Sequence, residues 1–404
     1  MSVAPARDGR ASSTSRLPTP LATLIGRFDA NVFDAPRGPL RIRLAVAREA
    51  EWDVLVAHGL ATVAPPEQRP DALLTADAKT WTQIAANATS GLRAFASGGL
   101  SVRRNLHAGI AFLAATSGAN EPGRLRFHSV STSSGSLSLM EAGTGPPLLA
   151  LHGLGGTKVS FLTTVAALAP RFRAIAVDLP GFGDSDKPIG AAYDARYFAD
   201  AVAGLLDALA LPSAHLVGNS LGGRIALEVG LRYPSRVDRL ALLAPALAWR
   251  RDRPGLALMR LARPELGLVQ LAPRGFVEAI VHRLIPGADK GWTAAGVDEF
   301  LRAYLTPSGR AAFYAAARHI YIEQPDGEQG FWTRLGRLRA DALFVWGRRD
   351  RLVPVAFARH VAQALPRAQH LELDCGHVPQ VESPRQTHAA LTAFLSAPAE
   401  RARA

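Results

Sequence analysis

One serine in the chain has the surroundings of a catalytic nucleophile. Ser220 lies in the segment GNSLG, which fits the pattern Gly-x-Ser-x-Gly. An apolar strand is predicted to end just before it, and a helix is predicted to begin at Leu221. Such a strand–turn–helix exposes the serine hydroxyl at a sharp turn and points helix N–H groups at the reacting centre. We therefore predict that Ser220 is a nucleophile, with a plain helix N-cap as the alternative.

A serine hydroxyl attacks a carbonyl only when a base removes its proton, and a third group must orient that base. Asp350 and His377 each follow a predicted apolar strand late in the chain, in the order serine, acid, histidine. Asp374 is the competing acid, but it is so close in sequence to the histidine that it is too local to reach around the imidazole ring. The prediction is a catalytic triad of Ser220, Asp350 and His377.

An acyl-transfer site also needs two N–H donors for the oxyanion that forms on the substrate. The residue after the nucleophile, Leu221, supplies one of them. The other is expected in the segment HGLGG at 152–156, from Leu154 or, in reserve, from Gly155. His152 is expected to brace this loop through hydrogen bonds and not to transfer protons.

These residues lie in a stretch that alternates predicted strands and helices, which is typical of an α/β fold with a mostly parallel sheet and helices on both faces. The stretch covers residues 124–404 and is interrupted at about 245–340 by a mostly helical insertion, which we expect to form a cap. A linker at 118–123 separates it from a smaller unit at 21–117. Residues 1–20 are expected to form a flexible leader.

The smaller unit mixes strand and helix patterns, so we predict a small α+β domain. Strand character is found at 41–47, 52–63 and 71–75. Asp77 is placed to cap the helix that follows the third of these. A strongly apolar helix is predicted at 106–116.

Five motifs in the larger stretch occur in a recognisable order: HGLGG, DLPGFGDSD, GNSLGG, GRRD and GHVPQVE. With them, residues 124–404 resemble the α/β-hydrolase superfamily, in its lid-bearing esterase- and lipase-like branch. The resemblance implies a serine hydrolase that works through an acyl-enzyme. Epoxide hydrolases and haloalkane dehalogenases of this superfamily carry aspartate at the elbow, so Ser220 argues against both.

The smaller unit resembles, over two segments, the sterol carrier protein-2 type of lipid-binding fold. The segments are LLTADAKTWTQIA at 73–85 and FASGGLSVRRNLHAGIAFL at 95–113. The resemblance implies a small sheet with helices around an apolar tunnel, without chemistry of its own. Arg104 and Asn105 replace a common Gly-Asp pair. Two interpretations stay open: a lipid-binding domain, or an accessory domain that only packs on its neighbour.

The composition is that of a folded protein, with 404 residues of which 48% are hydrophobic and 20% charged. No apolar run reaches the roughly 18 residues of a membrane-spanning helix, and the first residues lack the apolar core of a secretory signal. We therefore expect a cytoplasmic protein. A single cysteine, Cys375, excludes internal disulfides and a cysteine-based metal cluster. No metal or organic cofactor is expected.

The net charge of +12 is almost entirely arginine and is scattered along the chain. No basic block, zinc-ligand spacing or aromatic RNA-binding motif accompanies it, so no nucleic-acid partner is predicted. The insertion at 245–340 is basic, and peripheral contact with an anionic membrane surface is a second expectation. The sequence predicts no oligomeric state.

The favoured function is hydrolysis of carboxylic esters that have an apolar acyl or alcohol part, with a small apolar ester or lipid as the substrate. Three alternatives use the same triad: acyl transfer to an acceptor other than water, hydrolysis of a C–C bond, and cofactor-free perhydrolysis. A further alternative, from another class, is a lipid-binding or carrier protein with an inactive hydrolase half. The acyl length is not predicted.

Overall fold

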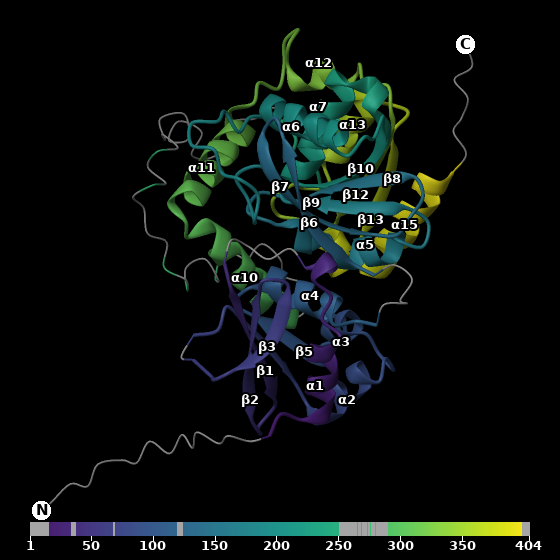
Figure 1. The fold of residues 1–404 in the computed structure, drawn as a ribbon. Helices are drawn as coiled ribbons and strands as arrows, with labels where there is room; N and C mark the ends of the chain where they lie inside the picture. Colours follow the sequence, from purple (N-terminus) through teal and green to yellow (C-terminus); the bar gives the residue numbers. More distant parts are fainter. Residues whose placement is uncertain are drawn as a thin grey trace, which may run out of the picture.

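The computed structural model describes residues 16–33, 38–67, 69–118, 124–249 and 290–397, together with single positions at 265, 268, 273, 275 and 279. Most of the predicted leader and linker, and the first part of the predicted cap, lie outside these ranges. Two β-sheets organise the rest, a five-stranded sheet near the N-terminus and an eight-stranded sheet that follows it (Figure 1).

The N-terminal unit, as we call the elements from α1 to α4, contains the five-stranded sheet in the order β3-β2-β1-β4-β5. Strands β1 and β4 are parallel and the other pairs are antiparallel. Its elements are α1 (Thr19–Gly26), the 3-10 helix η1 (Ala30–Val32), β1 (Leu40–Val46), β2 (Glu51–Ala57), β3 (Leu60–Ala64), β4 (Ala72–Ala76), α2 (Ala78–Ala85), α3 (Gly91–Ala96), β5 (Leu100–Arg103) and α4 (Leu106–Ala115).

The run of strand character at 52–63 folds as two strands, the hairpin of β2 and β3. His58 and Gly59 form its two-residue turn with φ values of +51° and +76°. Positive φ at both central positions makes the tight turn that matches the twist of a hairpin. Histidine is not one of the usual residues at the first of these positions, so the turn left no clear signal.

Helix α4 is buried along its whole length, with every residue from Leu106 to Ala115 in the interior. It packs against β4 and β5 of its own sheet and against β6 of the larger sheet. A helix that is apolar on all sides needs partners on all sides. The N-terminal unit therefore packs on the eight-stranded sheet through α4, an apolar helix that would be unfavourable in contact with water.

The eight-stranded sheet has the order β13-β12-β11-β10-β8-β9-β7-β6. The strands from β13 to β9 run parallel, and β7 and β6 are antiparallel at one edge. The strands are β6 (Arg126–Thr132), β7 (Gly135–Ala142), β8 (Pro147–Leu151), β9 (Arg173–Val177), β10 (Ala214–Asn219), β11 (Val237–Leu243), β12 (Asp341–Gly347) and β13 (Gln369–Leu373).

Helices lie on both faces of this sheet, as the alternating pattern predicts. The helices of the core are η2 (Lys158–Phe161), α5 (Leu162–Leu168), α6 (Ala195–Ala208), α7 (Leu221–Arg232), η3 (Pro234–Arg236), α13 (Phe357–Ala364), α14 (Pro379–Glu382) and α15 (Pro384–Ser396). The predicted cap contributes α10 (Lys290–Tyr304), α11 (Pro307–Ile322) and α12 (Phe331–Leu335). Successive residues of each strand point to opposite faces. In β8, for example, Leu148 belongs to one core cluster and Leu149 to the other.

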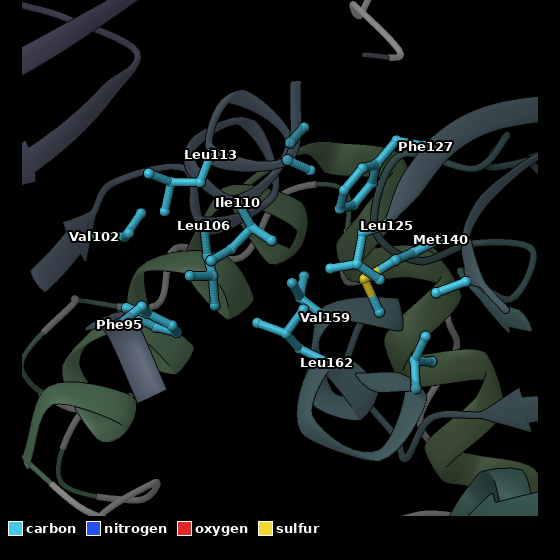
Figure 2. Packing of buried hydrophobic residues seen from close by; sticks show 14 of the residues in the cluster. Phe95, Val102, Leu106, Ile110, Leu113, Leu125, Phe127, Met140, Val159 and Leu162 are labelled. Carbon is cyan, nitrogen blue, oxygen red and sulfur yellow. The ribbon is translucent and has the colours of Figure 1, made fainter. Parts of the chain in front are cut away.

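The first of these clusters continues from the large sheet into the N-terminal unit. Figure 2 shows Ile110 of α4 in the same packing as Phe127 of β6 and Val159 of η2. All three side chains are almost fully buried. The two sheets thus share one hydrophobic core.

Among the described residues, no helix combines the length and the apolar character that crossing a bilayer requires.

Candidate active site

Ser220 occupies a strained turn between β10 and α7. Its φ is +51° and its ψ is −115°, a conformation that costs non-glycine residues of order 1–3 kcal/mol. The neighbouring glycines make the turn feasible. A β-carbon at Gly222 would lie 2.0 Å from the carbonyl oxygen of Leu151, and one at Gly218 would lie 2.4 Å from the Gly222 carbonyl carbon. The GNSLG segment therefore forms the sharp strand–helix turn that was predicted for it.

The structure brings Asp350 and His377 together. The loops after β12 and β13 place Asp350 Oδ2 2.8 Å from His377 Nδ1. The other carboxylate oxygen accepts hydrogen bonds from the backbone N–H groups of Leu352 and Val353, at 2.8 and 3.0 Å. Both oxygens of this buried carboxylate are thus held in place. The pair has the geometry by which an acid fixes the orientation and tautomer of a catalytic imidazole.

The competing acid, Asp374, lies elsewhere. Its side chain is 77% exposed and pairs with Arg349 Nε at 3.1 Å.

The adjacent Cys375 is buried. Burial, the main cause, and the nearby Glu382 carboxylate, the second, raise the pKa of its thiol to about 12. A thiol with such a pKa is not a nucleophile at neutral pH.

Two residues that the sequence did not single out fix the loop that carries His377. Asn219 donates from Nδ2 to the carbonyl oxygens of Leu243 and His377, at 2.9 and 3.1 Å. The histidine backbone is therefore fastened to the residue before Ser220. Glu382 accepts the N–H groups of the residues on either side of His377, at 2.8 and 2.9 Å. Its signal was visible as the last residue of the motif GHVPQVE.

The loop after β8 lies against the nucleophile turn. A β-carbon at Gly153 would be 3.3 Å from Ser220 Cβ. His152 is fully buried and uses both ring nitrogens, with Nδ1 2.8 Å from the Gly153 carbonyl oxygen and Nε2 accepting the Leu179 N–H at 3.0 Å. Burial lowers the pKa of this imidazole, so it is neutral and braces the loop, as expected. The N–H groups of Leu154 and Leu221 as oxyanion donors stay a prediction.

Aromatic side chains of the cap helices cover this loop. Phe300 of α10 and Phe313 of α11 approach Gly155, where a β-carbon would lie 2.5 Å from one ring and 3.1 Å from the other. Phe300 also stacks on Tyr304, with ring centroids 4.9 Å apart. The part of the site next to the predicted oxyanion donors is therefore walled by aromatic carbon.

A cavity of about 220 Å³ lies where α6, α7, α11 and α12 meet, with Leu221 among its lining residues. Four of its charged side chains pair with one another: Arg224 pairs with Glu228 and Glu323, and Arg334 pairs with Glu228. Within the described part of the chain, no group of three or more His, Cys, Asp or Glu side chains could hold a metal ion.

Comparison with known proteins identifies the fold of the larger part. The sequence profile of the alpha/beta hydrolase fold family matches residues 146–280. The chain is 31% identical over 264 residues to 2-hydroxymuconate semialdehyde hydrolase of Pseudomonas sp. (strain CF600), covering 64% of this chain and 88% of that protein. It is 30% identical over 261 residues to 2-hydroxy-6-oxo-6-phenylhexa-2,4-dienoate hydrolase of Burkholderia cepacia, covering 61% and 86%.

Among solved structures, the chain resembles a membrane phospholipase A, described as a bacterial virulence factor, with a TM-score of 0.58. The sequence identity is 31%, over 67% of this chain and 86% of that one. The chain belongs to the α/β-hydrolase fold family. The two relatives and the solved structure match it over 61–67% of its length.

Proposed function

We propose that the protein is a serine hydrolase that cleaves carboxylic esters with an apolar acyl or alcohol part. Ser220 attacks the ester carbonyl, and His377 takes its proton and later delivers it to the leaving alkoxide. Asp350 holds the imidazole, while the N–H groups of Leu221 and Leu154 stabilise the oxyanion. Water then attacks the acyl-enzyme and releases the acid.

The observation that carries this proposal is the 2.8 Å contact between Asp350 and His377 on a loop that Asn219 ties to the nucleophile turn. This arrangement supports a nucleophilic serine because its base is already oriented. An apolar substrate is supported by the aromatic rings of Phe300 and Phe313 beside the loop at 153–156. The likeness to a phospholipase A at 31% identity points in the same direction.

The test is hydrolysis of p-nitrophenyl esters of increasing acyl length, combined with mass spectrometry of the protein after a brief reaction. The proposal predicts turnover and an acyl group on the peptide that contains Ser220. Turnover that persists in Ser220→Ala, or an acyl group on another residue only, would contradict it.

Hydrolysis of a C–C bond is the second candidate, because two relatives of 30–31% identity carry the names of dienoate and semialdehyde hydrolases. The same three residues would serve it. Assaying the protein with a 2-hydroxy-6-oxo-dienoate and with an ester of similar size separates the two. A kcat/KM that is larger for the dienoate by a factor of about 100 would favour this candidate.

For the N-terminal unit we propose the domain boundary at 118–123 and an accessory role, with lipid binding as the alternative. The accessory role is supported by α4, whose residues all lie in the interior between the two sheets. Titration with a fluorescent fatty acid, repeated in Ser220→Ala so that turnover does not interfere, tests the alternative. Saturable binding at one site per chain would favour the lipid-binding interpretation.

A further inference from the structure

Helix α10 of the cap contacts the N-terminal unit with some residues and the candidate active site with others. It packs against β5 and α4 of the N-terminal unit. Phe300, on the same helix, contacts Gly155 in the loop beside Ser220. Contacts that hold α10 on the N-terminal unit therefore also hold the ring of Phe300 beside the loop at 153–156.

Two adjacent carboxylates of α10 fasten it to the N-terminal unit. Asp298 accepts from Arg103 Nε at 2.7 Å and from the Arg104 backbone N–H at 2.8 Å. Glu299 accepts the backbone N–H groups of Leu106 and His107, at 3.2 and 3.4 Å. These N–H groups open helix α4, where an anion is favoured because the first N–H groups of a helix have no partner within it.

The turn at 104–105, which contacts α10, has a defined backbone conformation. Arg104 has a φ of +74°, in the left-handed region, and Asn105 caps α4 by accepting the Ala108 N–H at 2.9 Å. This turn is where Arg-Asn replaces the common Gly-Asp of the resembled fold. In this conformation the backbone N–H of Arg104 donates to Asp298, and those of Leu106 and His107 donate to Glu299.

Ion pairs also connect α10 to the hydrolase core. Glu299 pairs with Arg302 at 2.7 Å, and Arg302 makes a second pair with Asp184 at 2.7 Å. Asp184 lies 3.4 Å from Nζ of Lys158, a fully buried lysine whose main partner is Asp178 at 2.6 Å. The helix is thus fixed on the N-terminal side and on the core side.

We propose that Asp298 and Glu299 are positioning residues through which the N-terminal unit holds Phe300 against the loop at 153–156, and that this unit thereby sets the size of the apolar group that the site accepts. The proposal rests on the proposed function for its substrate class. It gives the N-terminal unit a role in selectivity that needs no ligand of its own.

The test compares the double variant Asp298→Asn/Glu299→Gln with Phe300→Ala, which removes the ring itself. The readout is the ratio of kcat/KM for p-nitrophenyl laurate and p-nitrophenyl butyrate, which does not depend on the fraction of folded enzyme. Both variants are expected to change this ratio in the same direction, by about tenfold. Adding Phe300→Ala to the double variant is expected to change it little further.

The matched control is Asp200→Asn, which neutralises a carboxylate of the half-exposed ion pair with Arg232, far from α10 in the sequence and outside the interface. It should leave the ratio unchanged. If the double variant fails to fold, Arg103→Ala removes one donor whose side chain is 40% exposed and should shift the ratio in the same direction, by a smaller factor. An unchanged ratio in the double variant, or in Arg103→Ala when it stands in, overturns the proposal.

Amide hydrogen exchange gives a readout that does not require ester hydrolysis. Exchange in residues 294–304 and in the loop at 153–156 should become about tenfold faster in the double variant and stay unchanged in Asp200→Asn. If the wild-type protein hydrolyses neither ester, the proposed function fails, and faster exchange in both segments still supports the coupling from the N-terminal unit to the site. Unchanged exchange in the loop overturns it.

Discussion

At the scale of single residues, the proposed chemistry depends on the strained backbone of Ser220 and on the contact of His377 with Asp350. The sequence singled out both as candidates, because the glycines around the serine and the apolar strands before the acid and the histidine are local signals. It could not choose between Asp350 and Asp374 from contacts, since the choice depends on which loop faces the ring. The structure places Asp350 there and leaves Asp374 exposed.

Substitutions of the two acids should separate their roles. Ser220→Ala should lower kcat for esters by about 10⁶, and Asp350→Asn by about 10⁴, because the asparagine leaves the imidazole in the wrong tautomer. Asp374→Asn, the matched control, should keep kcat within about threefold. Steady-state kinetics measures all three. A loss in Asp374→Asn as large as that in Asp350→Asn would contradict the assignment.

The glycines of the nucleophile turn should differ sharply from a glycine elsewhere. Gly222→Ala should lower the free energy of unfolding by several kcal/mol, since its β-carbon would lie 2.0 Å from a carbonyl oxygen. Gly296→Ala is the matched control in another helix, where a β-carbon meets nothing within 4 Å. It should raise the free energy of unfolding by about 0.5–1 kcal/mol. Urea denaturation measures both.

At the scale of elements, the loops after the parallel strands bring the site together. The strand and helix alternation was predictable because buried strands are continuous apolar runs. The hairpin of β2 and β3 was not, since the turn at His58 has no typical turn residue in its first position. The capping of α2 by Asp77 was predictable from the residue alone, and Asp77 accepts the Thr80 N–H at 2.7 Å.

The loop that carries His377 should depend on Glu382. Glu382→Gln weakens two hydrogen bonds to backbone N–H groups, so we expect kcat to fall about tenfold while KM stays within about twofold. The matched control is Glu372→Gln, in a half-exposed pair with Arg348 at 3.2 Å. It should change neither constant. Equal effects of the two substitutions on kcat would rule out a specific role for Glu382.

At the scale of the whole molecule, the two sheets share one hydrophobic core, and ion pairs join α10 to the N-terminal unit and to the hydrolase core. This junction could not be predicted, because it depends on contacts such as that of Arg103 with Asp298, 195 residues apart in the chain. No local pattern marks such partners. The resemblance of residues 124–404 to a known family predicts the fold of that part. It does not predict the surface on which the N-terminal unit packs.

The free energy of unfolding should fall in mild acid, in part because of a half-buried histidine, His388. Burial lowers the pKa of His388 from 6.5 to about 4. The unfolded chain therefore takes up this proton at higher pH than the folded one. The stability linked to His388 is complete above about pH 6.5 and is lost as the pH falls to about 4, by about 2–3 kcal/mol.

Urea denaturation at about pH 7 and pH 4 measures this loss. His388→Gln should lose less stability over that interval than the wild type, by about 2 kcal/mol. His58→Asn, at an exposed turn, is the matched control and should follow the wild type. Identical losses in wild type and His388→Gln would show that this imidazole does not contribute.

The central claim is an oriented base next to a reactive serine, and covalent labelling tests it most directly. The protein is treated with a fluorophosphonate, digested, and analysed by mass spectrometry, in parallel with His377→Ala. We predict one adduct, on the peptide that contains Ser220, formed in the variant at a rate lower by at least about 10³. An unlabelled wild-type serine, or equal labelling rates in the two proteins, would contradict the account.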